Sequence, residues 1–308
     1  MQQYLKRYLF AITVYLFLPI FSLCQTVSDP NFVIRLTDPV YPDKEGPIVY
    51  YDTYHNNPFS LTGQYKAFAD VLYADGYGVK ELNQQLNEEI LQKASIFVTV
   101  SALSHLENWN LPNLPIYSQE EVDLLYTWVH DKGGSLFLIT DHMPAAGAVS
   151  SLSARFGFNM INGFTQRKDN GVEIFSRSRG NLLSSVVTDV GEKRIDSIRC
   201  WGSSGFIPPA NAEVFSLLGE EYDIFLPAQV VQMDHPTRNN IPYISGRHIA
   251  NGAILQCGKG RVCIFADGAS FTALLQSIKS EKRGMNHPDA AQHVQFLRNI
   301  IHWLDNRF

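Results

Sequence analysis

Short apolar runs alternate with amphipathic segments along the first half of the chain. Most of the runs are rich in β-branched or aromatic residues, and they predict strands at 47–52, 79–82, 95–101 and 135–142. Between the first two runs, apolar residues recur at helical spacing at Tyr65, Phe68 and Leu72. Strands that alternate with helices of this length indicate β-α-β units, and therefore a parallel sheet with both faces covered.

Capping residues place several helix boundaries. Ser118 and Glu121 form a capping box, since the hydroxyl and the carboxylate each accept a hydrogen bond from an otherwise unpaired backbone N–H. The helix behind them is expected to stop at Gly133-Gly134. Further helices are predicted at about 87–93 and at 144–156, where a proline occupies the first turn.

The α/β pattern breaks in the middle of the chain. Residues 158–256 alternate short apolar runs with Gly, Pro and Asn, so we interpret them as a β-rich insertion that partly extends the main sheet. The earlier pattern returns with a strand at 260–267, a helix from about Ser270 and a final helix at 288–306. The expected organisation is a single α/β domain over 25–308 with this insertion.

The N-terminus has the parts of a secretory signal. Lys6 and Arg7 precede an apolar run, and Ser22 and Cys24 stand where a signal peptidase would recognise small residues. We therefore predict a signal peptide at residues 1–24 and an exported protein, periplasmic or extracellular. Two alternatives stay open, a membrane anchor formed by the same run and a lipid attached at Cys24.

Composition and charge narrow the classes of partner. The chain has 308 residues, 45% of them hydrophobic, and a formal net charge of −5. Loss of residues 1–24 leaves 23 basic against 30 acidic residues, a net charge of −7. Mild acidity argues against a nucleic-acid partner, because phosphate contacts need a clustered basic face. We also expect no integral membrane span once the signal is removed, since no later segment is long and apolar enough.

Cysteine usage adds little chemistry. Three cysteines remain after the signal, and their number and spacing fit neither a disulfide framework nor a zinc motif. Cys257 and Cys263 flank a predicted turn at 258–260. A bridge between these two and a pair of free buried thiols are both open.

Polar residues end several of the predicted parallel strands. These residues are Asp52 with His55 close behind it, Ser101, Asp141 with His142, and Asp267. Because ligands bind outside the carboxyl ends of strands in open α/β sheets, we expect these side chains at one ligand-binding edge. Small residues after His142 leave room for an anion or an oxyanion at the next helix N-terminus. Each aspartate can instead be a helix or turn cap, which is the interpretation we favour for Asp267.

The same residues suit a hydrolytic site with or without a metal. Asp52, His55, His142 and His287 offer imidazole nitrogen and carboxylate oxygen, ligands that suit a divalent metal such as zinc. Without a metal, Asp52 or Asp141 would act as base or nucleophile, and His55 or His142 would carry the proton. The lesser candidates are His235 and His248. We interpret four histidines as solvated or helix-surface residues, namely His105, His130, His293 and His302.

Four segments carry a family resemblance: Asp52-x-x-His55, the helix end at 74–77, the helix-Gly-Gly-strand unit at 121–140, and the strand at 258–267. They resemble the class I glutamine amidotransferase-like superfamily, and more narrowly its secreted and membrane-associated bacterial branch. The resemblance covers roughly residues 45–160 and 250–305. It implies a flavodoxin-like, mostly parallel sheet with helices on both faces and a pocket at the edge inferred above.

The resemblance does not imply glutamine hydrolysis. True amidotransferases carry a nucleophilic cysteine at the turn that reads 139–143 here, and this turn contains no cysteine. The function we expect is therefore a secreted α/β hydrolase that acts on a small polar or carbohydrate-like ligand through Asp52, His55, Asp141 and His142. The alternative is a non-catalytic domain that binds such a ligand or serves an envelope complex.

Overall fold

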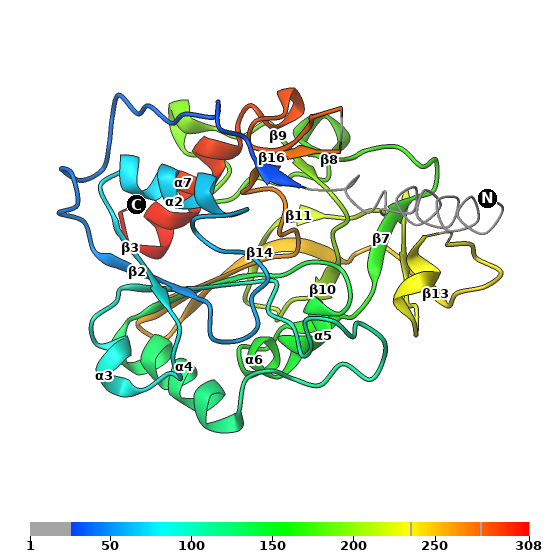
Figure 1. Ribbon diagram of the computed structural model, residues 1–308, viewed down its shortest axis with the longest axis horizontal. Helices are drawn as coiled ribbons and strands as arrows, with labels where there is room; N and C mark the ends of the chain where they lie inside the picture. The colour runs from blue at the N-terminus through cyan, green and yellow to red at the C-terminus, as the bar shows by residue number, and fades with distance from the viewer. Residues whose placement is uncertain (1–25, 235, 278, 308) are drawn as a thin grey trace, which may run out of the picture.

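The structure is a computed structural model, and it describes residues 26–234, 236–277 and 279–307. The predicted signal peptide at 1–24, including Cys24, and the minor candidate His235 lie outside the described residues. A mixed sheet forms the centre of the described chain (Figure 1). Its strands, in spatial order, are β3 (Gly78–Leu82), β2 (Ile48–Asp52), β4 (Ile96–Val100), β5 (Ser135–Ile139), β15 (Gly260–Phe265), β14 (Ala250–Cys257), β10 (Gly205–Ile207) and β6 (Asn159–Ile161), and β11 (Glu213–Leu217) also pairs with β14.

The prediction of a mostly parallel, flavodoxin-like sheet with helices on both faces is wrong. Strands β3, β2, β4, β5 and β15 run parallel, but β14, β10, β6 and β11 pair antiparallel. The reversal occurs at a tight turn between β14 and β15, where Gly258 has a φ of +57°. A Cβ there would lie 2.3 Å from the carbonyl oxygen of His130, so the turn requires glycine.

Three smaller sheets add to the departure from the predicted fold. They are β1 (Val27–Ser28) with β16 (Ala273–Gln276) and β17 (Glu281–Gly284), β13 (Tyr243–Ser245) with β12 (Tyr222–Phe225) and β7 (Phe164–Arg167), and β8 (Glu173–Ser176) with β9 (Ser197–Cys200). Short 3-10 turns at Arg177–Arg179, Gly191–Lys193, Val230–Met233 and Pro288–Ala290 connect some of these strands.

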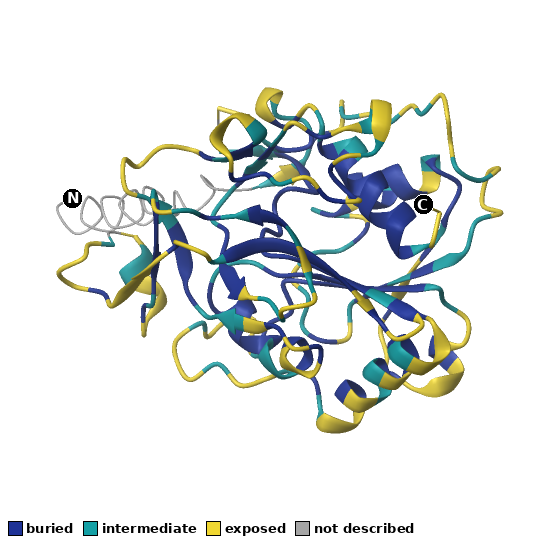
Figure 2. Cartoon of the chain, turned by 180° about the vertical axis from the view of Figure 1, so that it is seen from behind, coloured by how far each residue is buried: buried dark blue, intermediate teal, exposed yellow. Residues whose placement is uncertain are grey.

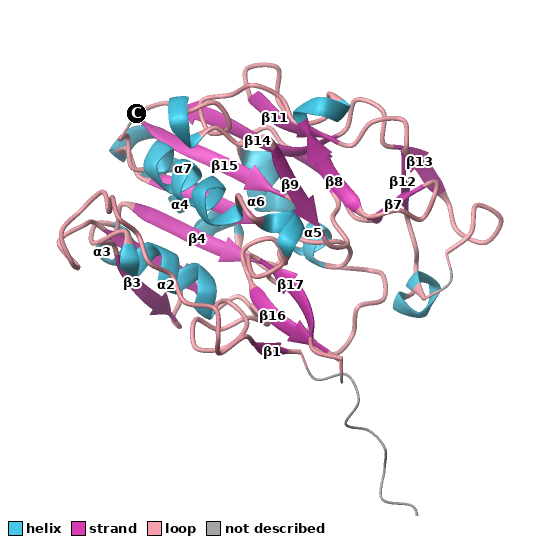
Figure 3. Cartoon of the chain, turned by 90° about the horizontal axis from the view of Figure 1, so that it is seen from above, coloured by secondary structure: helices cyan, strands magenta, loops and turns pink. Residues whose placement is uncertain are grey.

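Helices and small sheets share the covering of the central sheet. On one side lie α2 (Lys66–Ala74) and α7 (His293–Leu304), and on the other lie α3 (Glu88–Leu91), α4 (Gln119–Lys132), α5 (Ala145–Ala148) and α6 (Ser150–Arg155) (Figure 1). Seen from above, β8 and β9 lie next to α7 (Figure 3). Apolar residues of β8 and β9 belong to the same core cluster as those of α7, so strands cover part of this face.

Alternation along the strands explains how two cores form. In β5, Phe137 and Ile139 belong to the core on the α2 and α7 side, whereas Leu136 and Leu138 belong to the core under α4. Successive strand residues point to opposite faces, so a strand that is apolar throughout feeds both cores. Figure 2 shows the result, with the central strands buried and the exposed residues on helix surfaces and loops.

Some helix predictions agree with the structure and some do not. The capping box of Ser118 and Glu121 begins α4, and Gly133, with a φ of +87°, ends it. The helix expected at 144–156 is two short helices separated at Val149. The helix predicted to begin at about Ser270 does not form, because Ala273–Gln276 is a strand that pairs with β1 and β17. Within the described ranges, no helix has the length and apolarity needed to cross a bilayer.

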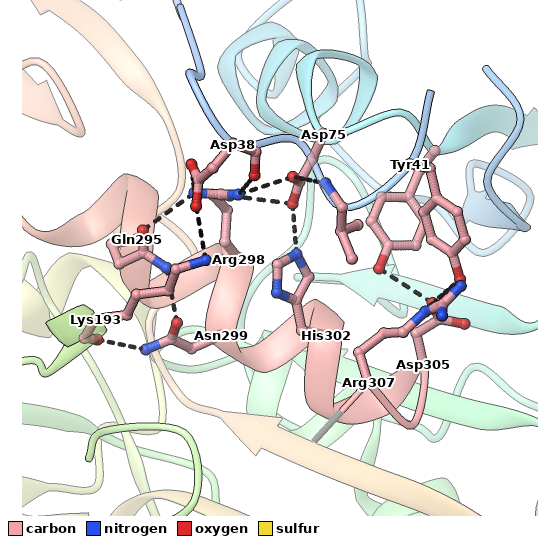
Figure 4. Close-up of polar contacts among 12 residues, drawn as sticks. Asp38, Tyr41, Asp75, Lys193, Gln295, Arg298, Asn299, His302, Asp305 and Arg307 are labelled. Atoms are coloured by element: carbon pink, nitrogen blue, oxygen red, sulfur yellow. Dashed lines mark hydrogen bonds and ion pairs between the residues drawn. The ribbon is translucent and has the colours of Figure 1, made fainter. Parts of the chain in front are cut away.

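A buried ionic cluster, which we call the anchor network, holds α7 against the N-terminal segment (Figure 4). The carboxylate of Asp75 accepts hydrogen bonds from Arg298 at 3.0 and 3.1 Å and lies 2.6 Å from Nε2 of His302. It also accepts from the backbone N–H of Val40, and Arg298 reaches Asp38. Burial by itself raises the pKa of Asp75, but the bonds from His302 and Arg298 lower it to about 2. The network therefore contains an ionised carboxylate with its partners in place.

Candidate functional site

The carboxyl ends of β2, β4, β5 and β15 carry the polar residues that the sequence singled out. Asp52 is the last residue of β2, Ser101 follows β4, Asp141 follows β5 by two residues, and Asp267 follows β15 by two. These residues divide between two hydrogen-bonded groups. One is centred on His55, and the other surrounds Gly268.

The group centred on His55 is closed and fully paired. Nδ1 of His55 lies 2.9 Å from Oδ2 of Asp52, and Nε2 lies 3.2 Å from Oε1 of Glu121. The hydroxyl of Tyr117 donates to Asp52 at 2.5 Å and lies 2.8 Å from Oγ1 of Thr99. Burial alone would lower the pKa of His55, but Asp52 and Glu121 outweigh it and raise the pKa above its ordinary value.

This pairing assigns both imidazole nitrogens to carboxylates. A protonated imidazole donates from both nitrogens, so His55 is held as a cation between two acids. The His55 side chain is 3% exposed and Asp52 is 1% exposed, which leaves no open face for a substrate. Glu121 accepts from the Ser118 N–H as the predicted capping box requires, and its second contact, with His55, has no signal in the local sequence.

The group around Gly268 contains a strained serine. Ser101 has a φ of +47°, in the left-handed region that residues with a Cβ rarely adopt. It is 3% exposed, and its Oγ has no hydrogen-bond partner among the described residues. A Cβ on Gly268 would lie 2.6 Å from this Oγ and 2.9 Å from Oδ2 of Asp141. The hydroxyl and the carboxylate therefore both lie next to the position that a Cβ at residue 268 would occupy, which only a glycine leaves open.

Asp141 and Asp267 are two carboxyl groups that influence each other through charge, Asp267 being fully buried and the Asp141 side chain 14% exposed. Burial raises the pKa of Asp141, and its interactions with His142, Arg283 and the Gly268 backbone offset this only in part. Burial and the charge of Asp141 raise the pKa of Asp267 to about 6. Two carboxylates this close do not both ionise readily, so the pair can hold a proton near neutral pH.

The two aspartates differ in what they bind. Asp267 is a cap, as the sequence favoured, because it accepts from the Ser270 backbone N–H at 2.7 Å and from the Trp201 N–H at 2.5 Å. Asp141 accepts from the His142 N–H at 2.8 Å through one oxygen, and its other oxygen faces Gly268 and Ser101. Asp141 also accepts a backbone hydrogen bond from Gly268, and its Oδ2 lies beside the same glycine position as Oγ of Ser101, so Asp141 is the member of the pair placed next to the serine.

His142 lies at the outer side of this group. Its Nδ1 lies 2.6 Å from the Met143 carbonyl oxygen, and its Nε2 lies 4.0 Å from Oδ1 of Asp141. The His142 side chain is 24% exposed, and the ring of Trp109 lies 6.1 Å away. The structure thus brings Asp141 and His142 together, and it places Asp52 and His55 in the separate group described above.

A hollow of about 310 Å³ lies beside Asp267, lined in part by Glu173, Arg199, Trp201 and Arg283. Burial raises the pKa of Glu173 to about 7, against the effect of its hydrogen bonds with Ser203 and Thr165. These residues are not among the predicted site residues, because most of them come from strands and loops of the β-rich region, whose pairing has no local sequence signal. A tryptophan next to Gly-Ser-Ser at 201–204 was the only local signal.

The proposed metal ligands do not converge. Asp52 and His55 bind each other, His142 binds the Met143 carbonyl, and both ring nitrogens of His287 lie within 3.2 Å of Nη1 of Arg199. In the parts of the chain that the structure describes, no three His, Cys, Asp or Glu residues are grouped as a metal site. Cys200, Cys257 and Cys263 are free and buried.

Comparison with known proteins bears on the fold alone. No family model matches the chain, and no curated protein matches it. The solved structure named mmIFT52 N-terminal domain is similar over 83% of this chain and 96% of that domain, with a TM-score of 0.58 and 11% identity. At 11% identity, this likeness extends to the fold and to no activity.

Two other solved structures are similar over most of their length. The cytoplasmic protein STM1381 from Salmonella typhimurium LT2 has a TM-score of 0.47 and 15% identity, over 83% of this chain and 98% of that one. A protein described as ThuA-like from Bacteroides uniformis ATCC 8492 has a TM-score of 0.45 and 11% identity, over 84% and 92%. The resemblance to the class I glutamine amidotransferase-like superfamily stays a prediction.

Proposed function

We propose that the protein is a hydrolase that removes an acyl group from a small polar or carbohydrate-like molecule, with Ser101 as nucleophile and Asp141 as base. The observation that carries this proposal is the left-handed backbone of Ser101 together with its buried, unpaired hydroxyl. A non-glycine residue in a left-handed conformation and a buried hydroxyl without a partner both cost stability, by about 1–3 kcal/mol each. Strain of this kind at the end of a strand is typical of a nucleophile held for reaction.

The chemistry follows from the two groups at Gly268. Oγ of Ser101 attacks the acyl carbon of an ester, and the Asp141 carboxylate accepts the hydroxyl proton. The bond to the leaving oxygen then breaks, and that oxygen takes the proton from Asp141. Water attacks the acyl-serine and gives a proton to Asp141, which returns it to Oγ as the acid leaves. His142, 4.0 Å from Asp141, lowers the pKa of the carboxyl group and favours its basic form.

Asp52 and His55 have a supporting role in this proposal. Their group is buried and fully paired, so it holds the loop after β2 in place without contacting a substrate. Export of the mature chain from residue 25 is part of the same proposal, which places the reaction outside the cytoplasm.

The test is a screen of mature protein, residues 25–308, against esters, amides and glycosides. We expect ester turnover that falls at least about 1,000-fold in Ser101→Ala and about 100- to 10,000-fold in Asp141→Asn. Ser151→Ala is the matched control, because Ser151 also has a buried hydroxyl without a partner but lies in α6. Ester turnover that survives in Ser101→Ala would contradict the proposal.

The second candidate function is ligand binding without turnover. It is favoured by one observation, that Oγ of Ser101 is covered in this structure as well as unpaired. The aromatic side chain of Phe59 lies 3.6 Å from the position of a Gly268 Cβ and is a neighbour of this space. This candidate predicts a thermal shift with a small polar ligand and no product with any ester, amide or glycoside.

A further inference from the structure

Two arginines and a tryptophan lie between two hollows next to the candidate site. Arg199, Trp201 and Arg283 line both the hollow of about 310 Å³ described above and a second one of about 440 Å³. Arg283 is close enough to lower the pKa of both Asp141 and Asp267 through its charge. The three residues are joined to the candidate site through Trp201, whose backbone N–H donates to Asp267.

Both guanidinium groups have unused donors. Nε of Arg199 and Nε of Arg283 are buried and lack a hydrogen-bond partner in the described part of the chain. Arg283 donates from Nη2 to the carbonyl oxygen of Trp201 at 2.9 Å. Arg199 donates from Nη1 to Asp289, a carboxylate that is 44% exposed and therefore a weak partner. Neither arginine makes the bidentate contact with a carboxylate that its guanidinium group allows.

The ring of Trp201 fixes the place of Arg199. The guanidinium carbon of Arg199 lies 4.9 Å from the ring centroid, and His287 and His293 contact the ring edge-on. The backbone of Trp201 is fixed as well, since its N–H donates to Asp267 and its carbonyl accepts from Arg283. One residue thus positions both arginines relative to the carboxyl pair.

We propose that Arg199 and Arg283, placed by Trp201, form a subsite for the carboxylate of a singly charged small molecule such as a sugar acid. The subsite deepens the proposed function, on which it rests, by naming the substrate class. A guanidinium fork matches the two oxygens of a carboxylate. Glu173 lines the same hollow, and Asp141 and Asp267 lie close enough to Arg283 to be affected by its charge, so the local field favours one negative charge over two.

The experiment measures binding by calorimetry in the Ser101→Ala variant of the mature chain, which separates binding from turnover. The probes are glucuronate, glucose and glucose 6-phosphate, matched in ring and differing in charge. We expect glucuronate to bind at least tenfold more tightly than either of the others. Arg283→Gln and Arg199→Gln should each remove this preference, and Arg155→Gln, a surface arginine paired with Asp123, should keep it.

Each outcome decides between readings of the subsite. Equal affinity for glucuronate and glucose, or binding of neither, would overturn the subsite, and tighter binding of glucose 6-phosphate would overturn the choice of a single charge. The thermal midpoint of each arginine variant is measured beside its affinity, and Arg199→Gln keeps the test valid if Arg283→Gln does not fold. If wild-type protein binds glucuronate but turns over no ester, the proposed hydrolase fails and the subsite stands.

Discussion

At the scale of single residues, the candidate site depends on the absence of one side chain. Gly268 leaves open the space that Ser101 and Asp141 share. The backbone conformation of Gly268 does not itself require glycine, since its φ lies outside the left-handed region. Glycine is therefore required at this position for a steric reason, since a Cβ would collide with the side chains of the candidate site.

Gly268→Ala should accordingly block the site more than it damages the fold. The new Cβ would meet Oγ of Ser101 at 2.6 Å, and overpacking of this kind costs about 1–3 kcal/mol of unfolding free energy. We expect ester turnover to fall below detection, and the added change Ser101→Gly to restore stability but not turnover. Urea unfolding and turnover of the two variants check this, with Gly78→Ala as control because a Cβ at Gly78 has room.

His293 gives a pH dependence of stability whose sign is fixed. Its Nε2 accepts from the Arg199 backbone N–H at 2.9 Å and its Nδ1 donates to the Ser270 carbonyl, so the buried ring is neutral. Burial lowers its pKa to about 4, below the ordinary value near 6.5. The unfolded chain thus binds the proton first, and stability falls by about 3 kcal/mol as the pH drops from 7 to 4.

His293→Gln isolates this contribution, because an amide can donate to Ser270 and accept from Arg199 without titrating. We expect the difference in unfolding free energy between the variant and the wild type to shift in favour of the variant as the pH falls. Urea unfolding at pH 7 and pH 4.5 measures the difference, and exposed His105→Gln is the control. A difference that does not change with pH would refute the assignment of His293 as a neutral buried group.

Sequence reasoning misjudged such residues for a physical reason. His293 and His302 were expected on a helix surface, but both are buried, one against the Ser270 carbonyl and the other against Asp75. Their partners lie 23 and 227 positions away in the chain, and no local pattern reveals them. Asp141 with His142 could be found, because strand ends are visible in the sequence. The strain at Ser101 could not, since it resides in the backbone.

At the scale of elements, the anchor network fixes α7 and the end of α2 through one carboxylate. Asp75→Asn would leave the buried Arg298 with only the exposed Asp38 as a charged partner, and breaking a buried pair typically costs about 3–5 kcal/mol. We expect a drop of that size in unfolding free energy at pH 7. The control is Asp70→Asn, which removes an exposed pair with Lys66 and should cost less than about 0.5 kcal/mol. Equal effects of the two variants would show that the network does not hold α7.

The elements predicted best were those with local signals. The expected strands 47–52, 95–101 and 135–142 contain β2, β4 and β5, and the expected helix behind Ser118 is α4. The direction of the strands in the second half of the chain could not be predicted from the sequence. The turn at 258–260 is predicted, but the antiparallel direction of β14, β10 and β11 depends on pairing between strands that are distant in the sequence. The prediction of a helix after Ser270 was wrong for a similar reason, because β16 pairs with β1 and β17, and β1 is distant in the sequence.

At the scale of the whole molecule, the antiparallel and parallel parts belong to one central sheet and both contribute to the core on the α2 and α7 side. Strand β15 pairs with β5 on one side and with β14 on the other. The rings of Phe215, Phe265, Phe271 and Phe296 pack together with centroids 5.5–6.1 Å apart, and Phe215 comes from the β-rich region. The predicted single domain over 25–308 therefore has a direct thermodynamic consequence.

Unfolding of the mature chain in urea should be a single cooperative transition. Hydrogen exchange followed by mass spectrometry should show protection of β5 and of strands within 158–256 disappearing at the same urea concentration, because loss of either part exposes the shared phenylalanines. Phe265→Ala should lower the midpoint for both segments together, by about 3–5 kcal/mol in unfolding free energy. If peptides from 158–256 lose protection first while β5 keeps its own, the insertion is an independent unit. The variant would then shift the two transitions unequally, and the single-domain prediction would be wrong.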